Sequence, residues 1–152
     1  LTARADSLVR TGTEGADRLV GTNGDDIIFG LGGNDRIIGR SGNDILGGGA
    51  GDDFIIGGNG NDRLIGGSGN NTLIGGGGNN TFVVGEGSDR VLGFNKRRDV
   101  LDLDGAFATA AEFKAATTRV RGSTVVRVPG GGSVSLPGIK PADLVVGTNV
   151  TL

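Results

Sequence analysis

Hydrophobic and polar positions follow a nine-residue period along residues 12–92. Within each unit, places one to six hold mainly Gly, Asn and Asp, and places seven to nine hold strand-forming, mostly apolar residues. Gly, Asn and Asp favour turns because they tolerate positive φ, whereas β-branched residues favour strands. Each unit therefore predicts a turn at places one to six and a very short strand at places seven to nine.

Nine consecutive units keep this register without a break. Place one is glycine in the first eight units, and place four is glycine in all nine. Such recurrence identifies structural repeats that stack, because a single unit cannot bury its apolar face alone. The residues at place six are, in chain order, Asp17, Asp26, Asp35, Asp44, Asp53, Asp62, Asn71, Asn80 and Asp89.

A turn plus a short strand, repeated, predicts a flattened coil in which two units complete one circuit and build two parallel sheets. Strand side chains alternate between faces, so place eight points inward and places seven and nine point outward. Place nine is nevertheless mostly apolar, which fits either a plain solvated surface or a face for docking or self-association. The predicted core ladders are Leu19, Ile37, Ile55, Leu73 and Val91 on one sheet, and Ile28, Leu46, Leu64, Phe82 and Val100 on the other.

Residues 93–152 leave the nine-residue period. Strand patterns recur at 99–104, 119–128 and 133–136, an Ala-rich helical pattern covers 106–116, and a helix-like turn is predicted at 141–144. A repeat array needs a cap over its open last coil. We therefore expect three regions, which are a lead-in at 1–11, a repeat roll at 12–92 and a C-terminal cap at 93–152.

Composition removes several classes of chemistry. The 152 residues include no His, Cys, Met, Tyr or Trp, which excludes the usual zinc sites, a His-based catalytic triad and disulfide bonds. No apolar run approaches the ~20 residues of a membrane helix. The net charge of −2 is too small to predict a partner, and we expect no nucleic-acid partner. Because the chain does not begin with Met, we expect a fragment or a processed product.

The aspartates of place six lie one coil apart in pairs such as Asp17 with Asp35 and Asp26 with Asp44. Stacked strands are ~4.8 Å apart, and two bare carboxylates at ~5 Å repel by roughly 3 kcal/mol at an effective dielectric constant of ~20. Over several coils this repulsion is comparable with the ~5–15 kcal/mol that stabilises a small domain. A divalent cation reverses the sign, and calcium suits the turns because it accepts about six to eight oxygen ligands, backbone carbonyls included.

The nonapeptide resembles the RTX (repeat-in-toxin) pattern GGxGxDxUx, as in Gly57-Gly58-Asn59-Gly60-Asn61-Asp62-Arg63-Leu64-Ile65. The resemblance covers residues 12–92 and implies an all-β fold, a right-handed parallel β-roll of nonapeptide repeats with a β-rich C-terminal cap containing a short helix. It also implies calcium ions that each bridge two turns one coil apart. The first turn gives its place-six Asp and the carbonyls of places two and four, and the second gives its Asp and the carbonyls of places one and three.

About four calcium sites with two Asp each follow from this resemblance. The first uses Thr13, Gly15, Asp17, Gly30, Gly32 and Asp35; the second uses Thr22, Gly24, Asp26, Gly39, Ser41 and Asp44; the third uses Leu31, Gly33, Asp35, Gly48, Ala50 and Asp53; the fourth uses Arg40, Gly42, Asp44, Gly57, Asn59 and Asp62. The corresponding sites between Asp53 and Asn71 and between Asp62 and Asn80 have one charge fewer, so we expect them to bind calcium weakly or to be empty.

Other interpretations compete at several positions. Turn-forming Asp without metal is the alternative for place six. For Asp99, Asp102 and Asp104, solvation at a strand edge is favoured over a further calcium site. Asn70-Asn71 and Asn79-Asn80 are expected to form amide ladders. The Gly-rich runs match phosphate-binding motifs, but no strand–loop–helix context supports them. Solvated surface is the favoured interpretation for Arg18, Arg36 and Arg90 and for the basic run Lys96-Arg97-Arg98.

The resemblance implies a bacterial protein that is secreted to the extracellular space or the cell surface through type I secretion machinery. We expect a calcium-binding structural module with no catalytic residues, which folds in extracellular calcium and supports secretion and folding of a larger protein. One alternative is an assembly or anchoring module of a surface-layer protein or adhesin. The other is an accessory domain of a secreted protease, lipase or mannuronan epimerase.

Overall fold

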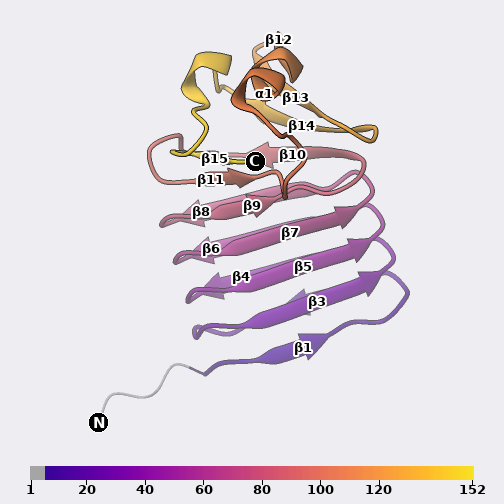
Figure 1. The fold of residues 1–152 in the computed structure, drawn as a ribbon. Helices are drawn as coiled ribbons and strands as arrows, with labels where there is room; N and C mark the ends of the chain where they lie inside the picture. Colours follow the sequence, from indigo (N-terminus) through magenta and orange to yellow (C-terminus); the bar gives the residue numbers. More distant parts are fainter. Residues whose placement is uncertain (1–5) are drawn as a thin grey trace.

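The structure, a computed structural model, describes residues 6–152, so residues 1–5 of the expected lead-in lie outside the described part. Two mainly parallel sheets face each other as a flattened coil (Figure 1). The first sheet holds, in spatial order, β1 (Val9–Thr11), β3 (Ile27–Gly32), β5 (Ile45–Ala50), β7 (Arg63–Ser68), β9 (Thr81–Val83), β11 (Val100–Asp102) and β15 (Val150–Thr151).

The second sheet lies behind the first in Figure 1. Between residues 6 and 152 the helical elements are α1 (Ala110–Ala116) and the 3-10 turn η1 (Pro141–Asp143), so the all-β fold class is confirmed. The strands of the second sheet, in spatial order, are β12 (Thr117–Val120), β13 (Ser123–Val128), β14 (Gly132–Pro137), β10 (Ser88–Leu92), β8 (Thr72–Gly77), β6 (Phe54–Asn59), β4 (Arg36–Ser41) and β2 (Arg18–Val20).

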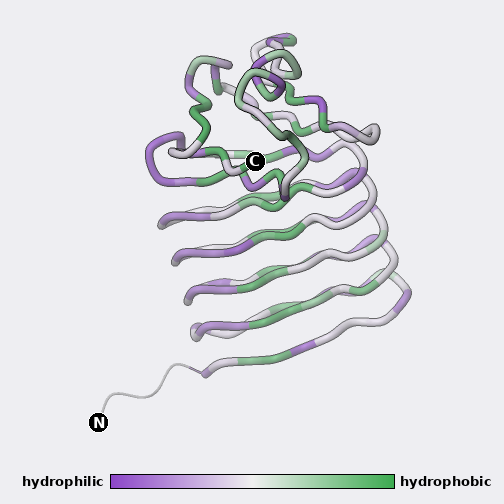
Figure 2. The backbone as a smooth tube through the Cα atoms, in the orientation of Figure 1, coloured by the Kyte–Doolittle hydropathy of each residue, from purple (hydrophilic) through white to green (hydrophobic). Residues whose placement is uncertain are grey.

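The core forms between the sheets from the place-eight residues, as predicted. These side chains are at most 2% exposed in all nine units. Each residue pairs with the one eighteen positions away, for example Ile37 with Ile55 and Leu46 with Leu64. Figure 2 shows the result, with apolar segments along the strands and hydrophilic segments at the turns.

Two details of the prediction are wrong. Leu101, and not Val100, continues the core ladder by pairing with Phe82. The reason is one extra residue in the turn before it. The hydrogen bond from Asn80 N–H to Asp99 Oδ1 spans 19 residues, whereas the equivalent bond from Asp62 N–H to Asn80 Oδ1 spans 18. The strands β3 to β8 are also six residues long. Places one to three continue the parallel pairing, as in Gly49 with Gly67, because glycine can pair there while keeping positive φ.

The tail extends both sheets, with β11 and β15 at the end of the first and β14, β13 and β12 at the end of the second. β14 pairs in parallel with β10, and β15 pairs in parallel with β11. β12, β13 and β14 form an antiparallel meander, in which β13 and β14 lie within or overlap the strand patterns at 119–128 and 133–136. The helix begins later than its Ala-rich pattern, because Thr109 caps it by accepting a hydrogen bond from Glu112 N–H (3.2 Å). The tail therefore covers the last coil of the roll.

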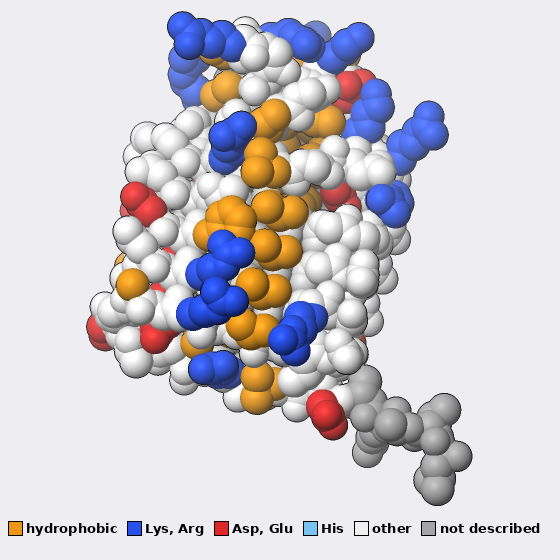
Figure 3. Space-filling view, turned by 180° about the vertical axis from the view of Figure 1, so that it is seen from behind, with side chains coloured by type: hydrophobic (Ala, Val, Ile, Leu, Met, Phe, Trp, Pro, Cys, Tyr) orange, Lys and Arg blue, Asp and Glu red, His pale blue; other side chains and the backbone are white. Residues whose placement is uncertain are grey.

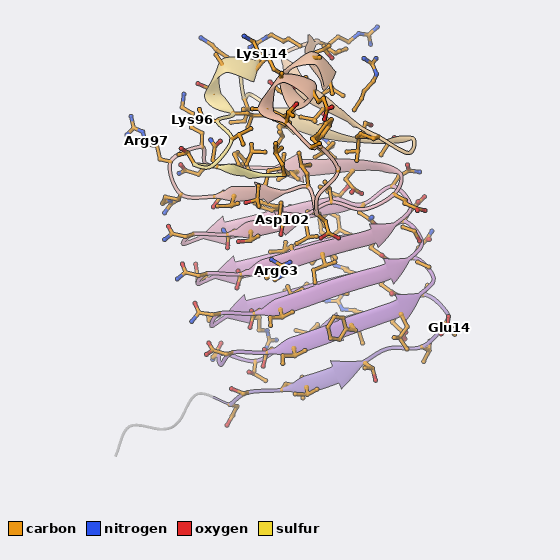
Figure 4. The ribbon with its side chains drawn as sticks, viewed as in Figure 1. Glu14, Arg63, Lys96, Arg97, Asp102 and Lys114 are labelled. Carbon is orange, nitrogen blue, oxygen red and sulfur yellow. The ribbon has the colours of Figure 1, made fainter. Side chains whose placement is uncertain are left out.

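One ion pair joins the tail to the roll, and further polar contacts join segments within the tail. Arg63 on β7 points toward Asp102 on β11 and forms an ion pair with it at 3.4 Å (Figure 4). Lys96 donates a hydrogen bond to Asp143 Oδ1 (2.6 Å), and the buried Asn149 donates to the carbonyls of Lys96 and Asp143. Among residues 6–152, no helix is long and apolar enough to cross a membrane.

Truncation of one buried cap residue tests this role of the tail. Leu136 is 0% exposed, so Leu136→Ala should lower the free energy of unfolding by about 2–5 kcal/mol, measured by urea denaturation in saturating calcium. Val120 lies in the same meander but is 47% exposed, so Val120→Ala should change the free energy by less than about 0.5 kcal/mol. Equal effects of the two substitutions would contradict a cap that is packed on the roll.

Candidate metal centre

The place-six side chains form two buried rows, one along each edge of the coil. In each row, Oδ1 accepts a hydrogen bond from the backbone N–H of the place-six residue one coil earlier. Asp17 N–H donates to Asp35 Oδ1 at 2.8 Å, and Asp35 N–H donates to Asp53 Oδ1 at 2.8 Å. The same bond joins Asp26 with Asp44 and Asp44 with Asp62. The turns thus stack with carboxylates directly above one another, as the sequence predicted.

A second ladder, at place five, runs beside this row on the outside of the turns. Here Oδ1 accepts from the backbone N–H one coil later: Asn43 N–H donates to Asp25 Oδ1 (2.6 Å), and Asp52 N–H donates to Asn34 Oδ1 (2.9 Å). The two ladders therefore point in opposite directions. The sequence analysis missed the place-five ladder, although the recurrence of Asn and Asp at that place was visible in the repeat.

The second carboxylate oxygen distinguishes the units from one another. The Oδ2 atoms of Asp35, Asp44, Asp53 and Asp62 are buried and have no hydrogen-bond partner among the described residues. In units one and two the corresponding oxygen is satisfied, because Thr13 N–H and Thr22 N–H donate to Asp17 Oδ2 and Asp26 Oδ2 (2.6 Å each). A buried oxygen without a donor is costly, so the four aspartates of units three to six require a partner.

In units one to six, Oδ2 of the place-six Asp faces a small space beside the place-one glycine of its own unit. A methyl carbon added to Gly12 would lie 2.6 Å from Asp17 Oδ2 and 2.6 Å from the carbonyl oxygen of Gly30, one coil later. Equivalent pairs of oxygens converge beside Gly21, Gly30, Gly39, Gly48 and Gly57. Glycine is thus required at place one because a side chain would fill the space between a carboxylate oxygen and a carbonyl oxygen.

Other carbonyls of the turns also lie against the next coil. The carbonyls of places two and four face the next coil, as with Leu31 O against Gly49 and Gly33 O against Gly51. Leu31 and Arg40 hold place two with φ of 83° and 92°. This conformation costs an L-residue ~1–2 kcal/mol, and such strain is typical of functional turns. The stacked turns thus place carboxylate and carbonyl oxygens of neighbouring coils close together, and the four residue sets implied by the resemblance stay a prediction.

Electrostatics disfavour these rows in their ionised state. Burial raises the pKa of Asp44 and of Asp53 from 3.8 to about 6, and neighbouring carboxylates, such as Asp62 and Asp26 for Asp44, add to the increase. Burial also raises the pKa of Asp62 and of Asp89. An acid with a raised pKa in the folded state loses stabilising free energy as pH rises through the interval from 3.8 to about 6. At neutral pH the folded rows therefore carry the full cost of their charge.

The residues present fit a hard cation that prefers oxygen. A buried carboxylate oxygen without a donor and a carbonyl oxygen converge on one small space, which is the donor set that calcium prefers. Within residues 6–152, no three His, Cys, Asp or Glu side chains gather in a group that could hold a metal ion.

Three sequence expectations need correction here. Asp99 is 3% exposed and continues the place-six row, so it is not solvated at a strand edge. Asn70 and Asn71 do not join an amide ladder: Asn70 Oδ1 accepts from the backbone N–H of Ser88, and Asn71 Nδ2 donates to Asp89 Oδ1 (2.9 Å). Asn79 N–H likewise donates to Asn61 Oδ1, so these ladders join side chains to backbone.

The outer face of the second sheet combines apolar and basic residues. Figure 3 shows an apolar stripe along the coil axis with Lys and Arg side chains beside it. The half-buried place-nine residues of this sheet run along it, and Arg36 lies 4.7 Å from the centre of the Phe54 ring. Docking or self-association through this face stays a prediction. The place-nine residues of the sheet are Val20, Ile38, Ile56, Ile74 and Leu92.

Comparison with known proteins decides the family. A model of the RTX calcium-binding nonapeptide repeat, in four copies, matches residues 11–46, 48–73 and 56–91, more than half of the 152 residues. The chain belongs to the RTX repeat family. RTX repeats bind calcium, which is the ion that the donor set favours. No curated protein matches the chain.

Solved structures share the RTX fold of this chain. The extracellular lipase LipA of Serratia marcescens is 20% identical, with a TM-score of 0.52, and the match covers 99% of this chain. The chain spans only 40% of the length of that lipase. The AlgE6R2 subunit of the mannuronan C5-epimerase of Azotobacter vinelandii is 26% identical, with a TM-score of 0.53, and the match covers 92% of this chain and 89% of the subunit.

A substitution at place one tests the metal centre. In Gly30→Ala the methyl group would lie between Asp35 Oδ2 and the Gly48 carbonyl, so the calcium concentration at the folding midpoint should rise about tenfold, equivalent to ~1.4 kcal/mol. Gly15→Ala is the matched control, because its methyl group would meet only Thr13 Oγ1, at 3.8 Å. The site is misplaced if both variants, followed by circular dichroism during calcium titration, fold at the wild-type midpoint.

Proposed function

We propose that the chain is a calcium-dependent folding module of a larger secreted bacterial protein. The observation that carries this proposal is the set of four buried Oδ2 atoms without a partner, at Asp35, Asp44, Asp53 and Asp62. In the unfolded chain these carboxylates are solvated by water. In the roll they are stacked one coil apart and buried, which destabilises the folded state. The roll is therefore stable only when a cation is bound.

The chain's own residues prepare the sites. Place-one glycines keep the spaces open, place-six Oδ1 atoms hold the turns in register, and the carbonyls of places two and four face the next coil. Calcium, when bound, supplies the positive charge and the oxygen coordination that the rows need. Binding and folding then form a single equilibrium, because the unfolded chain has no preformed site.

This coupling suits export through type I secretion machinery, which we propose as the route. A chain that stays unfolded at low cytoplasmic calcium can be threaded, and it folds where calcium is about millimolar, the range of weak extracellular sites. We further propose that 12–92 is the folding unit and that 93–152 caps it and carries the export signal. The module has no catalytic role in this proposal, and activity belongs to the rest of the parent protein.

The fold similarity to a secreted lipase and to an epimerase subunit favours the role of an accessory domain in a secreted enzyme. The apolar stripe of the second sheet supports the other role, assembly or anchoring of a surface-layer protein or adhesin. Both roles require the same calcium-dependent fold.

Circular dichroism with and without calcium tests the proposal. In a chelator the spectrum should be that of a disordered chain, and about millimolar calcium should restore β-structure. Magnesium at the same concentration is the control and should restore much less, because it demands a small octahedral site and retains its water. A β-rich spectrum that persists unchanged in chelator contradicts the proposal.

A further inference from the structure

We propose that the roll holds two calcium sites beyond the four double-Asp sites: one between Asp53 and Asn71 and one between Asp62 and Asn80. This inference rests on the proposed calcium-dependent function and sharpens it. Of the two expectations for a pair of turns with one charge fewer, weak binding or an empty site, it selects weak binding. Six sites, and not four, then follow the coil.

The first turn of each additional pair is built like its neighbours. Asp53 and Asp62 are 3% and 2% exposed, and their Oδ2 atoms lack a partner just as those of Asp35 and Asp44 do. A methyl carbon on Gly48 would lie 2.6 Å from the carbonyl oxygen of Gly66, and one on Gly57 would lie 2.7 Å from that of Gly75. Both spaces are therefore lined by a carboxylate oxygen and a carbonyl oxygen.

The second turn contributes the same atom whether it holds Asp or Asn. Asp53 N–H donates to Asn71 Oδ1 (2.9 Å) and Asp62 N–H donates to Asn80 Oδ1 (3.0 Å), as Asp35 N–H does to Asp53 Oδ1 (2.8 Å). This bond fixes the amide orientation, because only the oxygen can accept. The second-turn oxygen is therefore retained in position, and one formal charge is all that the pair loses.

An Asn in the second turn keeps the ligand oxygen in position, whereas an Asn in the first turn removes it. With its oxygen held by Asp53 N–H, Asn71 turns Nδ2 toward its own place-one glycine: a methyl carbon on Gly66 would lie 2.9 Å from that nitrogen. Nδ2 also donates to Asp89 Oδ1 (2.9 Å). An amide N–H cannot coordinate a cation, so the space that opens at Asn71 is closed without metal. Asn80 Nδ2 occupies the equivalent space beside Gly75.

The structure thus assigns a direction to the repeat. Each place-six residue takes part in two sites, one with the coil after it and one with the coil before it. Replacing Asp by Asn removes the site shared with the later coil and keeps the site shared with the earlier coil. The single-carboxylate sites should bind more weakly than the double-Asp sites because fewer ligand charges face the ion. Calcium binding should therefore show two classes of affinity.

Counting and locating calcium in the full chain tests this inference. Equilibrium dialysis against about ten millimolar calcium chloride, well above the ~1 mM of weak extracellular sites, should give six bound ions per chain. Anomalous diffraction from crystals grown in calcium should place two of them beside Asp53 with Gly66 and beside Asp62 with Gly75. Four ions, with none at these two positions, would overturn the inference and leave the proposed function intact, whereas a chain that binds no calcium would refute the proposed function itself.

Two neighbouring substitutions provide the matched comparison. Asp53→Asn should lower the count from six to five, with the loss at the Asp53 site and with calcium retained beside Asp35. Asp52→Asn changes the same charge one residue earlier, on the outer ladder where its Oδ1 accepts from Asn70 N–H (2.8 Å), and should leave six ions. A wild-type count in Asp53→Asn, or loss of the ion beside Asp35 as well, would overturn the directional rule.

Discussion

The fixed distance between stacked coils is the constraint on which the rest of the structure depends. A parallel coil of two nonapeptides brings each place-six residue directly above its equivalent, so every added coil adds one more Asp or Asn to each of the two rows. Two carboxylates at ~5 Å repel by roughly 3 kcal/mol at an effective dielectric constant of ~20. Exclusion of solvent raises the pKa of Asp44 and of Asp53 to about 6, and repulsion from neighbouring carboxylates adds to the increase. The apolar core, one side chain deep on each sheet, offers limited compensation.

In the turns, the two oxygens of each carboxylate have different roles. One oxygen joins neighbouring coils by accepting a backbone hydrogen bond, and the other faces the space that place-one glycine keeps open. The place-five ladder joins the same coils in the opposite direction. Register is therefore held by backbone-directed bonds even where Asn replaces Asp. The cation is left with the remaining oxygen, and the distinction between open and closed sites depends on whether that position holds oxygen or nitrogen.

The sequence predicted the period, the two sheets and the inward place-eight ladder, because each depends on a pattern that repeats in register. It failed where local context changes the register: one extra residue before Asp99 moved the core from Val100 to Leu101. It also wrongly assigned places one to three to turns, because the glycines at these places favour turns and the sequence does not show that their backbone pairs between coils. At Asn71 the number of charges predicted weak calcium binding between the Asp53 and Asn71 turns. Which oxygen of each side chain faces which turn depends on how the coils stack, and the sequence does not show this.

Hydrogen exchange of the backbone N–H groups that donate to the carboxylate rows tests the central claim most directly. Asp35 N–H and Asp44 N–H form bonds that exist only when the coils are stacked. In calcium these amides should be protected at least about a thousandfold, as expected for opening through global unfolding at ~5 kcal/mol. In chelator at the same pH they should exchange at the rate of an unfolded chain. Equal protection in chelator and in calcium would show that the carboxylate rows stack without a cation.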